Sequence, residues 1–352
     1  MLQSFLKNRV KFPLFKDDGK PFYAENKDLM HHVDLLNEKI KSKKYRQIKH
    51  ACLCGNVSPE KDVLLAQKDM WGISVDNYIC SKCGLVRSSE IFDDEATANF
   101  YNIDYKPIFY NISKPSADHF VSETVRGQQF YDLITSLGII NEIETVFENG
   151  CGMGGNLYPF FTSKKTCTGC DFAQEYVQYG IGKGLQLYFG EMNDKDTPDE
   201  SQDLILLSHV MEHLNEPIEE IIRLTKKLKP GKYLLVEVPG VFADAPYNYY
   251  PTRHLQKAHV FNFFYADFLK LFFEKLGLKV LFANERCTLV LQKPIDYKIP
   301  VLPIVIFDAS LAAYPERIKE LFIDSYVKHE MLNARNLPII RKIALFVKRL
   351  IQ

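Results

Sequence analysis

The pattern of hydrophobic and polar positions is most regular between about residues 145 and 292 of the 352-residue chain. Short apolar runs typical of buried strands recur there: TVFENGCGMGG, TCTGCDF, LQLYFGE, DLILLSHV, KYLLVEVPG and CTLVLQK. Amphipathic stretches lie between them: YVQYGIGK, PIEEIIRLTKKLKP and YADFLKLFFEKLG. Strands that alternate with helices predict a parallel or mostly parallel sheet covered on both faces, which is a doubly wound α/β domain.

The flanking regions have other patterns. The polar, lysine-rich start holds one helical pattern, DLMHHVDLLNEKI, and the next segment carries paired cysteines, glycines and short alternating runs such as SVDNYI. The end of the chain is punctuated by proline and then helical. We therefore predict four segments: a helical segment at 1–45, a small module at 46–115, the α/β domain at 116–295 and a helical extension at 296–352.

Composition narrows the class of protein. Lys and Arg (44) balance Asp and Glu (44), which argues against a nucleic-acid binder, because such proteins usually carry a basic excess. There is no apolar window of membrane-spanning length and no signal-peptide core, so we expect a cytoplasmic protein. The final segment, PIIRKIALFVKRLIQ, is basic and amphipathic. It suits either a helix packed on the body or a peripheral position at the inner face of the membrane.

A glycine-rich turn, ENGCGMGG, follows the first apolar run of the α/β region. Glycines allow a sharp turn and let a ligand approach the backbone, so the turn predicts a ligand cradle. Gly150, Gly152 and Gly155 satisfy the dinucleotide pattern G-x-G-x-x-G. Asp171, at the end of the next run, is placed to accept hydrogen bonds from ribose hydroxyls. From these residues alone, a nicotinamide ligand and an adenosyl ligand both remain open.

Four of the eight cysteines form two close pairs, each followed by glycine: Cys52 with Cys54, and Cys80 with Cys83. Two such pairs complete a tetrahedral site with no position left for water, so we predict a structural zinc ion. The other cysteines are expected in the core. Cys167 and Cys170 would point to opposite faces of one strand, and Cys151 and Cys287 have no partner in the sequence.

Five segments in order, ETVFENGCGMGGNL, GCDFAQEYV, FGEMND, SQDLILLSHVMEHL and LKPGKYLLVEVPG, resemble the motifs of class I S-adenosylmethionine-dependent methyltransferases, which have a Rossmann-like fold. In that family the glycine loop holds the methionine part of the cofactor, and the resemblance assigns this role to Glu148, Gly150, Gly152 and Gly154. The acid at the end of the second strand holds the ribose, which is Asp171 here. The segment after the third strand flanks the adenine, which assigns that contact to Glu191 with Met192. It also implies that Ser208 and His209 face the sulfonium. The chain departs from the commonest pattern in carrying Glu148 where that pattern has Asp, and in having Asn149 before the glycine.

The arrangement of CLCGN and YICSKCGLVR ahead of this core resembles zinc-module sugar methyltransferases, some of which methylate carbon atoms of nucleotide-linked deoxysugars. This resemblance implies a nucleotide-linked or surface-glycan-linked sugar as acceptor, in polysaccharide biosynthesis, with O- and C-methylation both open. The short carboxy-terminal part differs from the large second domain of those enzymes. A methyltransferase for another small-molecule or phosphate-linked acceptor remains an alternative, as does a non-catalytic cofactor-binding protein.

Candidate bases cluster after the fourth run and in a later loop. His209 and His213 are four residues apart, and would share a face if a helix begins there. The resemblance assigns proton handling to Glu212 with His213, but the same E-H-L ending also occurs in methyltransferases whose histidine only orders the helix, so a structural role for His213 remains an alternative. His254 and His259 follow in a loop whose aromatic and basic residues suit a sugar and a phosphate, respectively. These residues are Tyr247, Tyr249, Tyr250 and Arg253.

Overall fold

The computed structural model describes residues 10–21, 27–57, 59–109, 115–193, 195–243 and 255–335. By its internal contacts the chain divides into two compact units. The first unit comprises Met1–Ile108, Pro239–Phe268 and Val305–Gln352, and the second comprises Phe109–Val238 and Leu269–Ile304. The predicted boundaries followed changes in sequence pattern, whereas these units reflect contacts between segments far apart in the chain.

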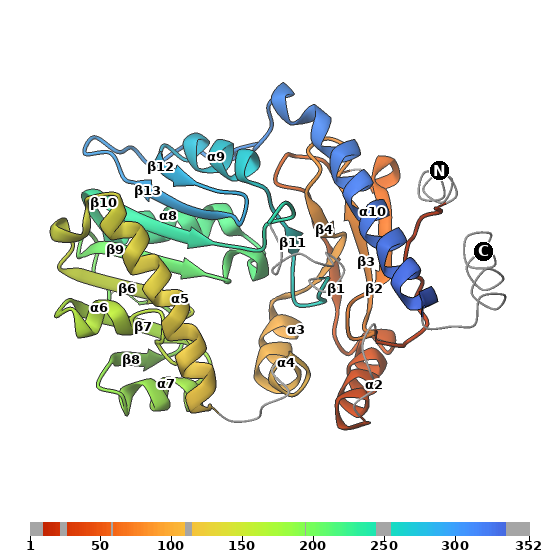
Figure 1. Cartoon of the computed structure of the whole chain (residues 1–352), viewed down its shortest axis with the longest axis horizontal. Coiled ribbons are helices and arrows are strands. Elements are labelled where there is room, and N and C mark those ends of the chain that lie inside the picture. Colours follow the sequence, from red (N-terminus) through yellow and green to blue (C-terminus); the bar gives the residue numbers. More distant parts are fainter. Residues whose placement is uncertain are drawn as a thin grey trace. The chain divides into compact units, whose positions relative to one another are not determined.

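The second unit contains a seven-stranded sheet in the order β12-β13-β10-β9-β6-β7-β8 (Figure 1). Strand β13 alone runs opposite to the other six strands, so the sheet is mixed, and the expectation of a mostly parallel α/β sheet is confirmed. Strand β12 was not predicted from the sequence pattern. The strands are β6 (Thr145–Asn149), β7 (Thr166–Asp171), β8 (Gln186–Phe189), β9 (Gln202–Ser208), β10 (Leu228–Glu237), β12 (Lys279–Ala283) and β13 (Thr288–Gln292).

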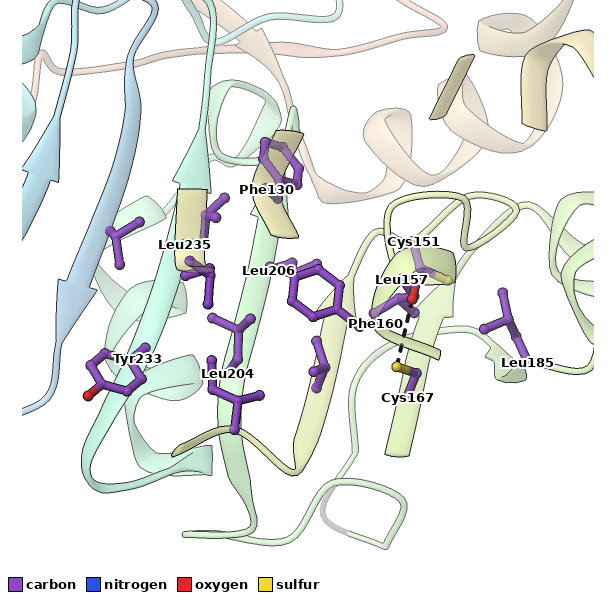
Figure 2. Packing of buried hydrophobic residues seen from close by; sticks show 14 of the residues in the cluster. Phe130, Cys151, Leu157, Phe160, Cys167, Leu185, Leu204, Leu206, Tyr233 and Leu235 are labelled. Atoms are coloured by element: carbon purple, nitrogen blue, oxygen red, sulfur yellow. Dashed lines mark hydrogen bonds between the residues drawn. The ribbon is translucent and has the colours of Figure 1, made fainter. Parts of the chain in front are cut away.

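The central strands are apolar on both faces, because helices cover both sides of such a sheet. All seven residues of β9 are buried. On one face, Leu204 and Leu206 of β9 join Phe130 in a core with α6 and α7 (Figure 2). The helices of this unit are α5 (Ala117–Ser136), α6 (Tyr158–Thr162), α7 (Gln174–Ile181), α8 (Pro217–Lys227) and the later part of α9 (Ala266–Lys275).

The strand order creates a switch point beside β6. From β6 the chain proceeds to β7 and β8 on one side, and then crosses to β9 on the other side. The connections after β6 and β9 therefore leave in opposite directions, which opens a crevice at the carboxyl ends of these strands. Ligands of open α/β sheets bind at such switch points. The glycine turn follows β6, and His209 follows β9, so the topology brings both to this edge.

The first unit contains a four-stranded antiparallel sheet, in the order β11-β4-β3-β2, and a two-stranded sheet of β1 and β5. The strands are β1 (Gln47–Lys49), β2 (Val63–Lys68), β3 (Ser74–Ile79), β4 (Val86–Ser88), β5 (Glu90–Phe92) and β11 (Phe261–Phe263). The helices are α2 (Lys27–Lys41), α3 (Asp94–Asn99), α4 (Tyr105–Phe109) and α10 (Tyr314–Arg335). Strand β11 extends the cysteine module's sheet, although it lies within the predicted α/β segment.

The carboxy-terminal helix α10 is an integral part of the first unit. Its Phe322 is fully buried and packs edge-on against Phe263 of β11, with ring centroids 5.9 Å apart. No helix in the described part of the chain is long and apolar enough to cross a membrane. The basic segment PIIRKIALFVKRLIQ, with its alternatives of packing and peripheral membrane association, lies outside the described residues.

Gly127 gives a test of helix packing in the second unit. Alanine is usually favoured over glycine inside a helix by about 1 kcal/mol. A Cβ at Gly127 of α5, however, would lie only 2.5 Å from the carbonyl oxygen of Asn156. We expect Gly127→Ala to lower the free energy of unfolding by about 1–3 kcal/mol, measured by denaturant titration. The exposed control Ser122→Ala should change it by less than about 0.5 kcal/mol. A more stable Gly127→Ala protein would contradict this close approach.

Candidate functional site

The glycine turn after β6 depends on backbone conformations that favour glycine. Gly150, Gly152 and Gly154 have φ values of 73°, 53° and 76°. A Cβ at Gly150 would lie 2.5 Å from Cγ2 of Val210, and one at Gly154 would lie 2.6 Å from Cδ1 of Leu185. The protein's own packing therefore requires these glycines, in addition to any ligand.

The amides of this turn are already hydrogen-bonded within the second unit. Those of Gly150 and Cys151 both donate to the carbonyl of Cys170, at 2.9 Å. The Gly152 amide donates to Oδ2 of Asp171 at 2.9 Å. A dinucleotide site needs amides that point at a pyrophosphate. Here the amides already donate to a carbonyl and a carboxylate of the protein, and the negative charge of that carboxylate would repel a phosphate. This geometry favours the adenosyl ligand over the nicotinamide ligand, the two that sequence spacing left open.

The loop is surrounded by three carboxyl groups. Glu148 is fully buried, and its Oε1 accepts a hydrogen bond of 2.7 Å from Nδ2 of Asn156, whereas its Oε2 has no hydrogen-bond partner in the described structure. Burial raises the pKa of Glu148 well above its usual value, and the charges of Glu123 and Asp171 raise it further, against the effect of Asn156. Asp171 also accepts a 2.7 Å bond from the Ala173 amide. Such a concentration of acids suits a cationic ligand.

Two exposed aromatic side chains lie at the carboxyl ends of β7 and β8. Phe172 follows Asp171 directly and is 57% exposed, and Phe189, which is opposite Asp171 in the strand register, is 56% exposed. They provide apolar surface beside the predicted ribose acid. Neither residue was predicted to belong to the site, although Phe172 directly follows that acid in the sequence. Glu191 is exposed, and Met192 is buried, so their predicted adenine contact stays a prediction.

At the ends of β9 and β10, a histidine bridges two carboxylates. His209 Nδ1 lies 3.2 Å from Oε1 of Glu212, and its Nε2 lies 3.3 Å from Oε1 of Glu237. Arg126 approaches the same oxygen of Glu237, at 3.6 Å, and Thr288 donates to Oε2 at 2.8 Å. Glu237 and Arg126 were not predicted, because only the fold brings α5 and the end of β10 to this histidine.

This bridge holds a positive charge on the imidazole. Burial removes water from the ring and lowers its pKa, but the hydrogen bonds to Glu212 and Glu237 outweigh this effect and raise the pKa of His209 to about 9. The pKa of Glu237 is lowered, because His209, Thr288 and Arg126 outweigh the effect of burial. With φ of 54°, His209 also has a strained left-handed backbone. At neutral pH its two nitrogens are therefore donors, which favours a positioning role over that of a base.

Comparison with known proteins bears on this geometry. Residues 118–282, just under half of the chain, match the family model described as a methyltransferase domain. These residues are similar to a methyltransferase domain. The match supports S-adenosylmethionine as its cofactor, as predicted from the ordered motifs. No curated protein matches the sequence.

Solved structures resemble parts of the chain. One is an O-methyltransferase family protein from Burkholderia thailandensis, with 17% identity, 50% of this chain and 58% of that chain covered, and a TM-score of 0.40. A SAM dependent methyltransferase from Aquifex aeolicus has 19% identity, coverages of 46% and 87%, and a TM-score of 0.36. One from Archaeoglobus fulgidus has 19% identity, coverages of 56% and 87%, and a TM-score of 0.39. The matched region thus spans less than two thirds of the Burkholderia chain.

The segment after β9 in the second unit differs from one prediction. His209 and His213 do not share a helix face, because Met211–His213 form a single 3₁₀ turn and α8 begins only at Pro217. The left-handed backbone at His209 separates it from that turn. His209 is instead paired with Glu212, three residues on. Glu212 is 1% exposed, and its Oε2 has no hydrogen-bond partner in the described structure.

The remaining candidates are divided between the units. Ser208 is 7% exposed at the end of β9, and His213 is half-buried, both in the second unit. His259 is buried next to β11 in the first unit, where its carbonyl accepts a 3.1 Å hydrogen bond from Ser88. His254, like Tyr247, Tyr249, Tyr250 and Arg253, lies outside the described residues. The catalytic roles of these residues stay predictions.

The four paired cysteines meet in the first unit. Cys52, Cys54, Cys80 and Cys83 are all buried, and their sulfur atoms lie within 4.8 Å of one another. The Cys52–Cys83 and Cys54–Cys80 Sγ distances are 3.6 and 3.5 Å. Tetrahedral zinc with bonds of about 2.3 Å places sulfurs about 3.8 Å apart, so the cluster has the dimensions of a zinc site.

Glycines and the carboxy-terminal segment support this cluster. Gly55 and Gly84, which follow the two cysteine pairs, have φ values of 74° and 82°, and their amides donate to the carbonyls of Cys52 and Cys80 at 2.8 Å. A Cβ at Gly84 would lie 3.0 Å from the backbone of Tyr314, at the start of α10. The glycines therefore form the tight turns of both pairs and admit the carboxy-terminal helix.

The other four cysteines are buried, as expected. Cys167 and Cys170 both lie on β7, but their sulfurs have different partners: the carbonyl of Leu157 at 3.7 Å and Oδ1 of Asn149 at 3.2 Å. The first contact is drawn in Figure 2. This separation confirms that the second CxxC sequence serves core packing.

The histidine bridge predicts a measurable pKa difference. Glu237→Gln removes one carboxylate and should lower the pKa of His209 by about 1 unit or more, measured by NMR titration of its ring. Because the folded pKa lies above the ordinary 6.5, the stabilisation from His209 should be complete below about pH 6.5 and be lost as pH rises towards 9. The exposed control Glu219→Gln should leave the titration unchanged. An unshifted pKa in Glu237→Gln would contradict the bridge.

Proposed function

We propose that this chain is an S-adenosylmethionine-dependent methyltransferase that acts on a sugar, either nucleotide-linked or surface-glycan-linked. The observation that carries the cofactor assignment is the occupied glycine turn. Its amides bond to the protein's own carbonyls and to Asp171, within a ring of carboxyl groups. A phosphate would be repelled from this place, whereas a ligand with a sulfonium and an ammonium group would be attracted.

Different residues of the second unit would bind different parts of S-adenosylmethionine. We assign the ribose hydroxyls to Asp171, and the hydrogen bonds that orient its two oxygens, from the amides of Gly152 and Ala173, support this role. The exposed ring of Phe172 offers apolar surface for the adenine. When bound, S-adenosylmethionine supplies a methyl group activated by the positive sulfur. The protein then has to align the acceptor and exclude water.

A hydroxyl or carbon-acid acceptor also has to lose a proton. The charged state of His209 makes it unsuited to accept that proton at neutral pH. We therefore assign the base to His213, with Glu212 beside it. Glu212 carries a buried carboxylate oxygen without a hydrogen-bond partner in the described residues, and this oxygen could accept a bond from a substrate hydroxyl.

The sugar assignment rests on the sequence. Tyr247, Tyr249 and Tyr250 provide flat, hydrogen-bonding surfaces, and Arg253 suits the phosphate of a nucleotide sugar. We further propose that the four clustered cysteines bind one structural zinc ion, because thiolates fill all four tetrahedral positions and leave none for water. Another small-molecule or phosphate-linked acceptor is the runner-up.

The acceptor class can be tested directly. The purified protein is incubated with methyl-labelled S-adenosylmethionine and a panel of nucleotide sugars, free sugars and phosphorylated small molecules, followed by mass spectrometry and NMR location of the label. We expect transfer to a nucleotide-linked or glycan-linked sugar. Labelling only of a non-sugar acceptor would replace the sugar assignment. Tight cofactor binding with no transfer to any acceptor would favour a binding protein.

Asp171 gives a test of the cofactor cradle. Asp171→Ala removes charge-assisted hydrogen bonds worth about 1.5–3 kcal/mol, so the affinity for S-adenosylmethionine should fall by about tenfold to a hundredfold in calorimetry. Glu175→Gln, which changes an exposed acid in the first turn of α7, is the matched control and should bind like the wild type. Unchanged affinity in Asp171→Ala would remove the ribose assignment.

The zinc proposal predicts a defined stoichiometry. Elemental analysis should find about one zinc per chain, and the double variant Cys80→Ser/Cys83→Ser should lose the metal and unfold at a lower temperature. The matched control Cys167→Ala/Cys170→Ala also removes two buried cysteines but should keep the metal. A metal-free double variant as stable as the wild type would disprove the structural role.

A further inference from the structure

We propose that Glu123 of α5 is a further cofactor-binding residue, whose carboxylate interacts with the cationic methionine end of S-adenosylmethionine above the glycine turn. This inference rests on the proposed function and deepens it. Glu123 lies 25 positions before Glu148 in the sequence, within a helix, so no motif marks it.

The position of Glu123 is defined by the glycine turn itself. Its Oε2 accepts a hydrogen bond of 3.3 Å from the amide of Gly155. Its Oε1 lies 3.1 Å from the point where a Cβ of Gly152 would stand. The amide of Gly152 donates to Asp171, so two carboxylates from different elements flank one glycine. Two carboxylates therefore lie beside this part of the turn, which suits a ligand with two positive groups.

The charges around Glu123 are unbalanced. From α5 itself, Arg126 acts on Glu123, and His119 Nε2 lies 3.6 Å from its Oε1. From β7 and β6 come Asp171 and Glu148, and from α7 comes the phenol of Tyr176. The pKa of His119 is lowered, first by burial and then by Arg126, so this ring adds little positive charge at neutral pH. Three acids therefore face one arginine.

A second observation that supports a cationic ligand at the glycine turn is the buried carboxyl group of Glu148. Glu148 is fully buried, and its Oε2 has no hydrogen-bond partner in the described part of the structure. A buried carboxyl oxygen left in this state is costly unless a ligand or water completes it. Asn156 holds the other oxygen of Glu148, so the unpaired oxygen belongs to the same acid ring as Glu123 and Asp171.

The arrangement makes cofactor binding depend on protons. Burial raises the pKa of Glu123 to about 7, and Asp171 adds to this, against the effects of the Gly155 amide and Arg126. Part of the free protein therefore holds a proton on Glu123 at neutral pH. A cation favours the carboxylate, so binding should release that proton to the solvent. Affinity should then rise with pH through about 7.

Calorimetry on the full chain tests this. S-adenosylmethionine binding is measured between pH 6.0 and 7.5, where the ligand's own amino group stays mostly protonated, and at pH 7 in two buffers of different ionisation enthalpy. We expect wild-type affinity to increase by roughly five- to tenfold across this range, with net proton release at pH 7. Glu123→Gln should bind more weakly at pH 7.5, and both the pH slope and the proton release should be lost.

Two controls separate the outcomes. Asp132→Asn makes the same charge change on the exposed face of α5 and should behave like the wild type. Methylthioadenosine has the adenosine part without either positive group, so its affinity should not depend on pH or on Glu123. This comparison needs only the wild-type protein, and therefore holds if Glu123→Gln fails to fold.

The failures are distinguishable. An equal pH slope for S-adenosylmethionine in wild type and Glu123→Gln, or an equal slope for both ligands in the wild type, would overturn the role of Glu123 and leave the proposed function standing. No binding of S-adenosylmethionine by the wild type at any pH would instead remove the proposed function.

Discussion

The hydrogen bonds that fill the glycine turn after β6 are the constraint on which the proposed site depends. A turn of this sequence can bind either a phosphate or a cation, since the spacing of Gly150, Gly152 and Gly155 fits both. The hydrogen-bond partners of its amides determine which ligand it can bind. Cys170 and Asp171 at the end of β7 supply acceptors from a neighbouring strand, which leaves a negatively charged cradle in place of an anion site. The sheet order is what brings these acceptors to the turn.

The same sheet edge holds a second polar system with a different purpose. His209 is fixed on both nitrogens by Glu212 and Glu237, and Arg126 approaches Glu237 from α5. A histidine held this way loses its freedom to exchange protons near neutral pH, but it gains a fixed orientation and charge. The left-handed backbone at His209 costs energy, and the bridge supplies interactions that can offset it. Helix α5 thus contributes both Glu123 and Arg126 to the edge.

Most elements of the second unit could be predicted, because continuous apolar runs such as DLILLS identify buried strands, and amphipathic stretches identify covering helices. Strand β12 was missed, since KVLFA is short and directly follows a helix. The site was predicted less completely. Residues next to a motif, such as Asp171, were found from spacing. Glu123, Arg126 and Glu237 were not, because their roles come from distant elements packed on the turn. The helix face proposed for His209 and His213 was wrong, since spacing alone does not fix backbone conformation.

The sequence by itself determined the α/β class, the cysteine pairs and the ordered cofactor motifs, because each depends on local spacing or on short-range periodicity. Only the tertiary structure decided what the glycine turn accepts, which histidine carries a fixed charge, and that the carboxy-terminal helix α10 belongs with the cysteine cluster. These properties depend on hydrogen bonds, desolvation and packing between residues far apart in the chain. Such contacts have no fixed separation in the sequence, so they cannot be predicted from a local pattern of residues.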